Sequence, residues 1–369
     1  MHNLRVTSHG RLQVIRKLLI FAKMKILLAI DSFKGCLSTF EAEQAAASVL
    51  VGDEVIRVPV SDGGEGFTDC WVECFGGIYR ECRAKDPIGR EITTRYGLLD
   101  KGKTAVIETA AASGITLLSS AERDPVKASS FGTGQLIQDA INQGVERIYL
   151  GLGGSATVDG GVGLLQAVTS LPDGLEIHAF YDTDIPFYGP SGAACIYGPQ
   201  KGADPATVAL LDRRLENLGK EWSRQYGKDI QTIPGAGAAG GIGGALALIL
   251  GAGMHRGIRT FLEWTGFRKK VEGAALVITG EGKADSQTVT GKVPSGVLEA
   301  VKAWAPEAQV WLMAGKIEDR DSLLAHGFDR LIQITPENAM SGNYLDKQFA
   351  VSCIQRSLSR ELQDFRNQQ

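Results

Sequence analysis

Acidic and basic side chains follow three apolar runs of the sequence that are typical of β-strands, at residues 24–30, 54–60 and 274–279. The polar residues after these runs are Asp31, Ser32 and Lys34, then Asp62 and Glu65, and then Glu281, Asp285 and Gln287. Carboxylates can hold Mg²⁺ directly or through water, and lysines can neutralise phosphate or carboxylate oxygens. Because ligands of parallel sheets bind beyond the carboxyl ends of the strands, these residues indicate phosphoryl-transfer chemistry at that edge.

Glycine is unusually frequent, with 46 residues, and it gathers in two segments. The first, residues 151–157, contains Gly153, Gly154 and Ser155 and lies between a predicted strand and a predicted helix. The second, residues 235–244, contains Gly237 and Gly240 and opens an apolar helix. Backbone N–H groups in such segments favour phosphate, so we expect nucleotide binding here. For the second segment, close helix packing explains the glycines equally well.

Two familiar nucleotide-binding patterns occur in an unsuitable context. Residues 97–104 match the P-loop pattern G-x-x-x-x-G-K-T, but a strand rather than a helix is predicted to follow them. We therefore interpret residues 100–103 as a hairpin turn. Residues 235–240 match the dinucleotide pattern G-x-G-x-x-G, but no strand is predicted before them, which argues against a nicotinamide site.

Strands and helices alternate at both ends of the chain, whereas residues 79–110 have the short alternating runs of a β-meander. We therefore predict an α/β fold with a Rossmann-like parallel-sheet domain from residues 24–69 and 271–369. An α+β domain, residues 70–270, is inserted into it, and the active site is expected in the interdomain cleft. Residues 1–23 look like an extension outside the fold.

Composition excludes several classes of protein. The formal net charge is −3, so no basic excess is available for nucleic acid. No apolar stretch approaches the roughly 20 residues that span a bilayer. The six cysteines show no metal-ligand spacing, and a reducing cytoplasm is the expected location. The sequence leaves a homodimer open.

Eight motifs together resemble the bacterial glycerate kinase family of two α/β domains. They are MKILLAIDSFKGCLS, VPVSDGGEGF, DPIGRE, ETAAASGI, LGLGGSATVDGGVGLLQA, GPSGAACIYGPQKGA, GAGAAGGIGGAL and ITGEGKADSQTVTGK. The resemblance implies phosphorylation of D-glycerate by ATP with Mg²⁺, most often giving 2-phosphoglycerate.

Carried over residue by residue, the resemblance places in the cleft the eight polar residues that follow the three apolar runs, Asp31 among them. As hypotheses for individual roles, we assign Lys34 to the transferred phosphate and either Asp184 or Asp285 to the proton of the substrate hydroxyl. The expected Mg²⁺ ligands are Asp62, Glu65 and Glu281. The expected substrate-binding residues are Ser32, Gln287 and, for the carboxylate of glycerate, either Arg90 or Lys201.

Three other readings stay open. The enzyme could phosphorylate another small hydroxy acid, or transfer to the 3-hydroxyl of glycerate. A nucleotide-binding regulator without catalysis would keep the glycine segments but would have no need of the acidic residues. A nicotinamide oxidoreductase would bind NAD instead of ATP.

Overall fold

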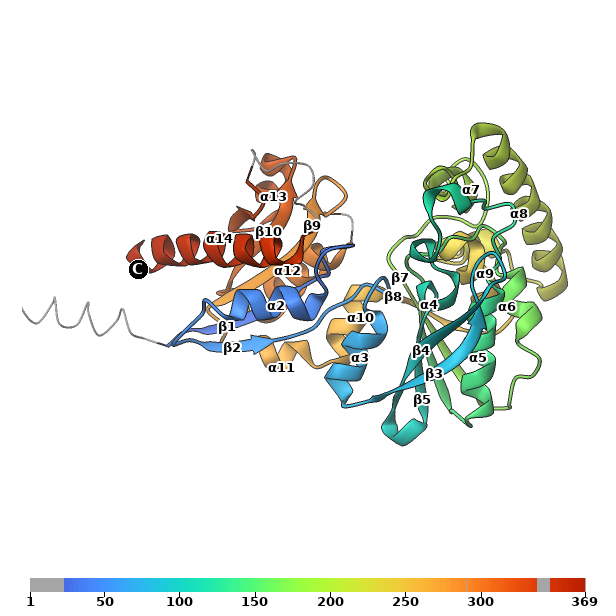
Figure 1. Ribbon diagram of the computed structural model, residues 1–369, viewed down its shortest axis with the longest axis horizontal. Helices are drawn as coiled ribbons and strands as arrows, with labels where there is room; N and C mark the ends of the chain where they lie inside the picture. The colour runs from blue at the N-terminus through green and yellow to red at the C-terminus, as the bar shows by residue number, and fades with distance from the viewer. Residues whose placement is uncertain (1–22, 290, 337–345, 369) are drawn as a thin grey trace, which may run out of the picture. The chain divides into compact units, whose positions relative to one another are not determined.

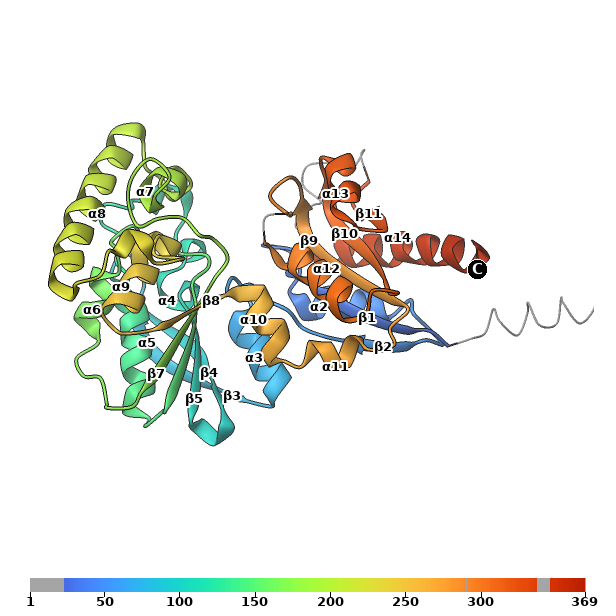
Figure 2. The same ribbon diagram turned by 180° about the vertical axis from the view of Figure 1, so that it is seen from behind.

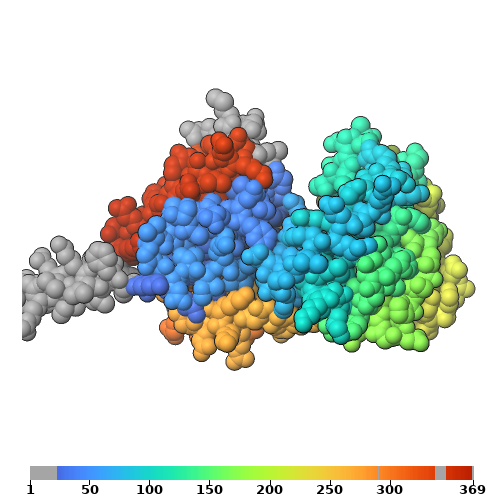
Figure 3. Space-filling view, turned by 60° about the horizontal axis from the view of Figure 1, so that its bottom comes forward, coloured from blue at the N-terminus to red at the C-terminus, as the bar shows by residue number. Residues whose placement is uncertain are grey.

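A computed structural model of the protein describes residues 23–289, 291–336 and 346–368. The predicted extension, residues 1–23, lies outside the described residues apart from Lys23. The described chain forms two units. The first contains the residues up to Val58, Phe267–Val289 and the residues from Val297 onward, so that both chain ends, blue and red, form it (Figures 1 and 3). The second contains Pro59–Gly266 and residues 291–296.

The first unit is built on a fully parallel sheet with the strand order β11-β10-β9-β1-β2. Its strands are β1 (Lys25–Ile30), β2 (Glu54–Arg57), β9 (Leu276–Ala284), β10 (Gln309–Ile317) and β11 (Arg330–Gln333). In the register of β1 and β9, Ile30 lies opposite Gly280. Asp31, which follows β1, therefore lies next to Glu281, which is still within β9, because β9 runs past the predicted end at residue 279 as far as Ala284.

Helices cover both faces of this sheet. The helices are α2 (Thr39–Ala47), α11 (Phe267–Val271), α12 (Val293–Trp304), α13 (Arg320–His326) and α14 (Lys347–Gln368). The apolar residues of α2 and α14 pack on one face, in a core that includes Ile26, Leu28, Trp311 and Met313. Seen from behind, α12 lies in front of the sheet and covers the other face (Figure 2). The side chains of residues 26–30 in β1 are all fully buried, which fits a parallel sheet covered on both faces.

The second unit contains a mixed sheet with the strand order β3-β4-β5-β6-β7-β8. Its strands are β3 (Ile78–Lys85), β4 (Glu91–Leu99), β5 (Thr104–Glu108), β6 (Arg147–Gly151), β7 (Glu176–Tyr181) and β8 (Gly253–Arg256). Strands β3, β4 and β5 pair antiparallel, as expected for the predicted meander. From β5 to β8 the neighbouring strands pair parallel. The carboxyl ends of β5, β6, β7 and β8 therefore share one edge.

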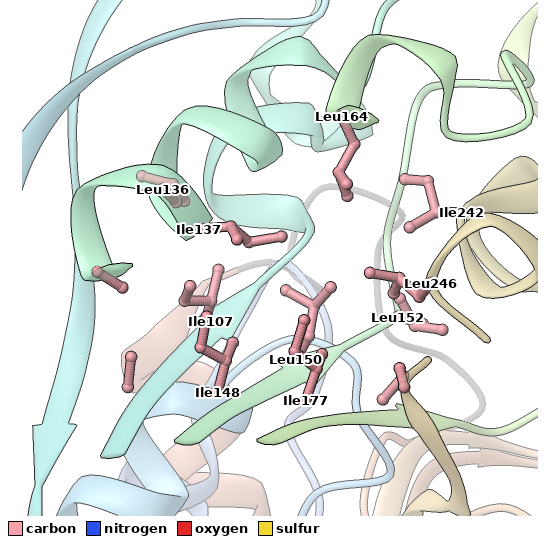
Figure 4. Packing of buried hydrophobic residues seen from close by; sticks show 14 of the residues in the cluster. Ile107, Leu136, Ile137, Ile148, Leu150, Leu152, Leu164, Ile177, Ile242 and Leu246 are labelled. Atoms are coloured by element: carbon pink, nitrogen blue, oxygen red, sulfur yellow. The ribbon is translucent and has the colours of Figure 1, made fainter. Parts of the chain in front are cut away.

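Helices lie on both faces of the mixed sheet. They are α3 (Phe67–Phe75), α4 (Ala110–Ser113), α5 (Phe131–Asn142), α6 (Val162–Ala167), α7 (Ala193–Tyr197), α8 (Pro205–Tyr226), α9 (Ile242–Leu248) and α10 (Gly257–Trp264). Figure 4 shows Ile148 and Leu150 of β6 packing beneath α5, α6 and α9. Tyr149, between them, instead joins an aromatic cluster with Trp71 and Trp264. Successive side chains of β6 thus pack on opposite faces of the sheet, each covered by helices, so the unit has three layers.

The predicted α/β fold, with one parallel sheet drawn from both chain ends and a second sheet inserted, is confirmed. The predicted domain ranges, residues 24–69 with 271–369 and residues 70–270, stay a prediction. The loop after β2, which was assigned to the first domain, belongs here to the second unit. The P-loop match is a hairpin turn, as predicted, because Leu99 and Thr104 pair antiparallel across it. Within the described ranges, no helix is both long and apolar enough to cross a membrane.

Candidate functional site

The segment after β1 is a tight turn that carries Lys34 at its tip. Phe33 and Leu37 form a β-bridge that closes the turn, and Gly35 adopts a positive φ of 75°. Lys34 is exposed there, whereas Asp31 and Ser32 are buried beside the sheet. Asp31 Oδ1 accepts the Ser32 N–H at 2.8 Å, and the Asp31 N–H donates to Gly280 O at 2.9 Å. The turn therefore fixes a carboxylate at the strand end and places a cation in solvent.

The end of β9 and the segment after it bring Glu281 and Asp285 together through Thr288, which is fully buried. The Thr288 hydroxyl donates to Glu281 Oε1 at 2.6 Å and accepts the Asp285 N–H at 2.9 Å. Asp285 Oδ1 accepts the Gln287 N–H at 2.9 Å, and its Oδ2 lies 3.3 Å from Lys283 Nζ. This segment is thus a compact acidic loop with one partly neutralised carboxylate.

In the second unit, the loop after β2 packs on the carboxyl ends of the strands. Asp62 is nearly buried, and its Oδ1 accepts the Gly64 N–H at 3.0 Å. The Gly153 N–H donates to Gly63 O at 2.9 Å. A side chain at Gly257 would come within 1.7 Å of the Asp62 carbonyl oxygen. The Asp62 loop therefore lies against both the glycine segment after β6 and the start of α10, while Glu65 is exposed.

The two glycine-rich segments meet each other. A Cβ at Gly240, where φ is +70°, would come within 1.9 Å of the Thr157 carbonyl oxygen. Gly237 and Gly240 are both buried, and Gly237 packs against Ile185 and Pro186. By contrast Gly154 is exposed. A ligand can therefore reach the segment after β6. The segment of residues 235–244 is buried and packs against it.

The two cationic residues that were expected to bind a carboxylate are both engaged within the protein. Arg90 donates to Asp86, to Glu122 and to the carbonyl oxygen of Leu117. Lys201 is buried, and its Nζ donates to Ser155 Oγ and to Thr157 O, each at 2.8 Å. Arg90 could not bind a ligand without giving up part of this bonding, whereas the two acceptors of Lys201 leave one N–H of its ammonium form unused.

Asp184 lies in a pocket of about 730 Å³ at the ends of β7 and β8. Its carboxylate forms an ion pair with Arg256, the last residue of β8. Tyr181 and Arg259 also line this pocket. The pocket therefore offers a carboxylate and two guanidinium groups, and both arginines remain largely exposed.

The comparisons with known proteins decide the family. The family model described as "Glycerate kinase family" matches residues 26–173 and 168–351. The chain belongs to the glycerate kinase family. A glycerate kinase of Bacillus subtilis (strain 168) is 38% identical over 348 residues, which cover 85% of this chain and 91% of the relative. A glycerate 2-kinase of Escherichia coli (strain K12) is 35% identical over 361 residues, 87% of this chain and 94% of the relative.

Solved structures give the same result. A crystal structure from Salmonella typhimurium LT2, provisionally assigned as glycerate kinase 2, superposes with a TM-score of 0.75 at 33% identity. It covers 94% of this chain and 100% of that one. The family resemblance expected from the sequence motifs is therefore confirmed, and this glycerate kinase family member is a phosphotransferase.

Two residues of this family member join the candidate site although the sequence analysis did not single them out. Thr288 stood inside a quoted motif, and its position three residues after Asp285 is the spacing of a side chain that accepts a backbone N–H. Arg256 ends a short strand that the sequence analysis did not predict. Ligands of parallel sheets bind beyond the strand ends, so Arg256 becomes a candidate only when β8 is known to end there.

The part of the chain that the structure describes holds no group of three or more His, Cys, Asp or Glu side chains poised around a metal ion. Mg²⁺ does not need one, because it usually binds one or two carboxylates together with waters and substrate phosphates. Asp62 of the second unit and Glu281 of the first unit are each, taken singly, a carboxylate of this type. Each is nearly buried, and a hydrogen bond from the protein reaches one oxygen of each carboxylate.

Proposed function

We propose that this enzyme transfers the terminal phosphoryl group of ATP to the 2-hydroxyl of D-glycerate, giving 2-phosphoglycerate and ADP. The observation that carries the proposal is the match along nearly the whole length of a relative named glycerate 2-kinase. The strand-end carboxylates and the glycine segment that the proposed chemistry requires are present in this chain. Phosphoryl transfer depends mainly on positioning and on neutralising charge, which these groups can supply.

We assign the nucleotide phosphates to the segment after β6. Gly154 and Ser155 present backbone N–H groups without bulky side chains, a feature of anion-binding loops, while the Gly153 N–H donates to Gly63 O and fixes the start of the loop. Gly237 and Gly240 are buried, so their proposed role is to support this segment. The helix that follows, α6, has only six residues and begins at Val162. The loop itself would therefore bind the phosphates.

Asp62, Glu65 and Glu281 are the proposed Mg²⁺ ligands. When bound, Mg²⁺ neutralises phosphate oxygens as charge develops on them. The chain's own contribution is to fix the carboxylates: the Gly64 N–H orients Asp62, and the Thr288 hydroxyl orients Glu281. Glu65 is exposed and has more freedom to adapt.

For the acceptor, Lys34 is proposed to neutralise the transferred phosphoryl group from the tip of its turn. Asp285 and Asp184 remain the alternatives for accepting the hydroxyl proton, and Ser32 and Gln287 are proposed to bind the substrate. The Ser32 hydroxyl is buried and makes no hydrogen bond to the described residues, so an acceptor hydroxyl could satisfy it. Because Arg90 and Lys201 are engaged internally, Arg256 joins them as a candidate for the carboxylate.

The test is ADP release from ATP with D-glycerate, tartronate and glycolate in parallel, each with Mg²⁺ and with excess EDTA. The proposal predicts turnover with D-glycerate that EDTA abolishes. Turnover only with another acid would establish a different hydroxy-acid kinase. ADP release from none of them, with nucleotide still bound, would favour a regulator.

A further inference from the structure

Lys201 is a buried ammonium group beneath the glycine segment after β6. It ends the short 3₁₀ turn Pro199–Lys201, and only 4% of the residue is exposed. Its Nζ donates to the Ser155 hydroxyl and to the Thr157 carbonyl, each at 2.8 Å. An ammonium group has three N–H donors, so the two recorded acceptors do not exhaust it.

This ammonium group has no counter-charge in contact with it. Among residues 23–289, 291–336 and 346–368, no carboxylate lies within 4.0 Å of Lys201 Nζ. Asp159 is the charged group that acts on Lys201, but its carboxylate already accepts N–H groups from Ser130 and Gly161 and the Ser130 hydroxyl. A buried charge without a contacting partner is unfavourable. Accordingly, burial lowers the pKa of Lys201 to about 7, and Asp159 offsets only part of that effect.

The other charged groups around Lys201 do not supply the missing charge. Gly202, the next residue, packs against the carbonyl of Arg123, which is itself cationic. Asp204 uses a carboxylate oxygen to accept the Thr207 N–H at the start of α8. Neither residue is an ion-pair partner of Lys201 in the described structure.

An anion bound at the glycine segment after β6 could supply the missing negative charge. Ser155, which Lys201 contacts, directly follows the exposed Gly154. The Thr157 hydroxyl is fully buried and makes no hydrogen bond to the described residues. An anion held by Gly153–Ser155 would therefore lie next to Ser155, the residue whose hydroxyl Lys201 contacts. Lys201 is buried there, in surroundings of low polarity. Coulomb interactions are strong in such surroundings.

We propose that Lys201 is a positioning residue of the phosphate-binding segment, and that binding of a phosphate-bearing ligand there is coupled to the uptake of one proton by Lys201. The inference rests on the proposed function, which places nucleotide phosphates at Gly153–Ser155. In the free protein at pH 8, Lys201 is mostly the neutral amine, because its ammonium form has no counter-charge in contact, and the amine holds the segment through Ser155 and Thr157. In the complex, the proton from solvent makes it the counter-ion of the bound phosphate.

The test is isothermal titration calorimetry of the full chain with the Mg²⁺ complex of β,γ-imido-ATP at pH 8, in buffers that differ in ionisation enthalpy. At this pH the phosphates of the Mg²⁺ complex are already ionised, so the ligand takes up no proton of its own. The slope of the binding enthalpy against the buffer ionisation enthalpy counts the protons taken up. We expect close to one proton for the wild type at pH 8, and uptake that disappears as the pH falls from 8 to 6.

Lys201→Met, which keeps the side-chain length without the charge, should lose the uptake and bind the analogue about tenfold more weakly. The matched control is Lys220→Met, because Lys220 is exposed and pairs with Glu216 on α8. This control should keep the full slope. A merely structural role for Lys201 would weaken binding without changing the proton count.

Binding by the wild type without proton uptake, or uptake that persists in Lys201→Met, overturns the inference and leaves the nucleotide site standing. No binding of the analogue by the wild type overturns both this inference and the proposed function. If Lys201→Met does not fold, the pH series on the wild type decides, because only a group with a pKa near 7 gives uptake that disappears between pH 8 and pH 6.

Discussion

Glu108 is a partly buried carboxylate at a strand end that contributes both to the structure and to the pH dependence of stability. It ends β5, and its Oε1 accepts the Thr68 N–H at 2.8 Å. The helix α3 has Gly66 as its N-cap and therefore no capping side chain of its own. Burial raises the pKa of Glu108 to about 7, and the nearby charges of Asp69 and Glu65 add to the effect.

This pKa predicts a pH-dependent stability. Between pH 4.5 and 7 the folded state binds more protons at Glu108 than the unfolded state, so the free energy of unfolding falls as the pH rises through that window. Glu108→Gln removes the fall. We expect it to match the wild type near pH 4.5 and to be more stable by about 1–3 kcal/mol at pH 8. Urea unfolding at several pH values measures this, and Glu146→Gln, at an exposed site, should keep the wild-type profile.

Asp285 tests the acidic loop after β9. As a proposed proton acceptor it should lose about 10²- to 10⁴-fold in kcat when changed to Asn. Because Asn keeps an oxygen to accept the Gln287 N–H, the loop should survive. The control is Asp364→Asn, on the exposed side of α14. Turnover of Asp285→Asn near the wild-type rate would remove Asp285 from the chemistry and leave Asp184 as the candidate.

At the scale of single residues, the sequence was informative where a side chain directly follows a strand. Asp31 and Glu281 could be placed at one sheet edge; the structure puts Asp31 directly after β1 and Glu281 within the neighbouring strand β9, which is longer than predicted. The environment of Lys201 and Arg90 could not be foreseen. Their partners, such as Ser155 at 46 residues' separation from Lys201, are set by tertiary packing that no local pattern encodes.

At the scale of elements, Gly240 decides whether the two glycine segments can pack. It combines a positive φ of 70° with a Cβ position only 1.9 Å from the Thr157 carbonyl oxygen. Gly227, after α8, has nearly the same φ of 67° but nothing within 4 Å of its Cβ position. The pair therefore separates backbone strain from steric overlap.

We expect Gly227→Ala to destabilise the protein by about 1–2 kcal/mol, the penalty for an L-residue in the left-handed region. Gly240→Ala should destabilise by at least about 2 kcal/mol more, since backbone atoms must move apart. Denaturant midpoints of the two variants measure the difference. Equal midpoints would show that the contact between the glycine segments is loose.

The meander of β3, β4 and β5 could be predicted, because alternating side chains and turn residues are local signals. The helix α8 was not predicted, although Asp204 and Pro205 provide a start signal and Gly227 an end signal. The strand β8, only four residues long, gave no usable periodicity, and its place beside β7 depends on pairing far along the chain. The pocket around Asp184 and Arg256 therefore could not be predicted either.

At the scale of the whole molecule, each unit has a core of its own. The second unit encloses buried residues from β5, β6, β7, α5 and α9 within Pro59–Gly266. We expect residues 59–266, produced alone, to unfold in one cooperative transition, because their sheet and its covering helices are all present. This fragment should have no phosphotransferase activity, since Lys34, Glu281 and Asp285 lie outside it. A broad, non-cooperative transition would contradict the independence of the core.

The central claim is transfer to the 2-hydroxyl of D-glycerate, and its most direct measurement couples the reaction to enolase without a phosphoglycerate mutase. Enolase converts 2-phosphoglycerate but not the 3-phosphate, so the coupled absorbance reports the position of transfer. The account predicts an enolase signal that needs ATP, Mg²⁺ and D-glycerate and matches the ADP released. ADP released with D-glycerate but without the enolase signal until the mutase is added would contradict it.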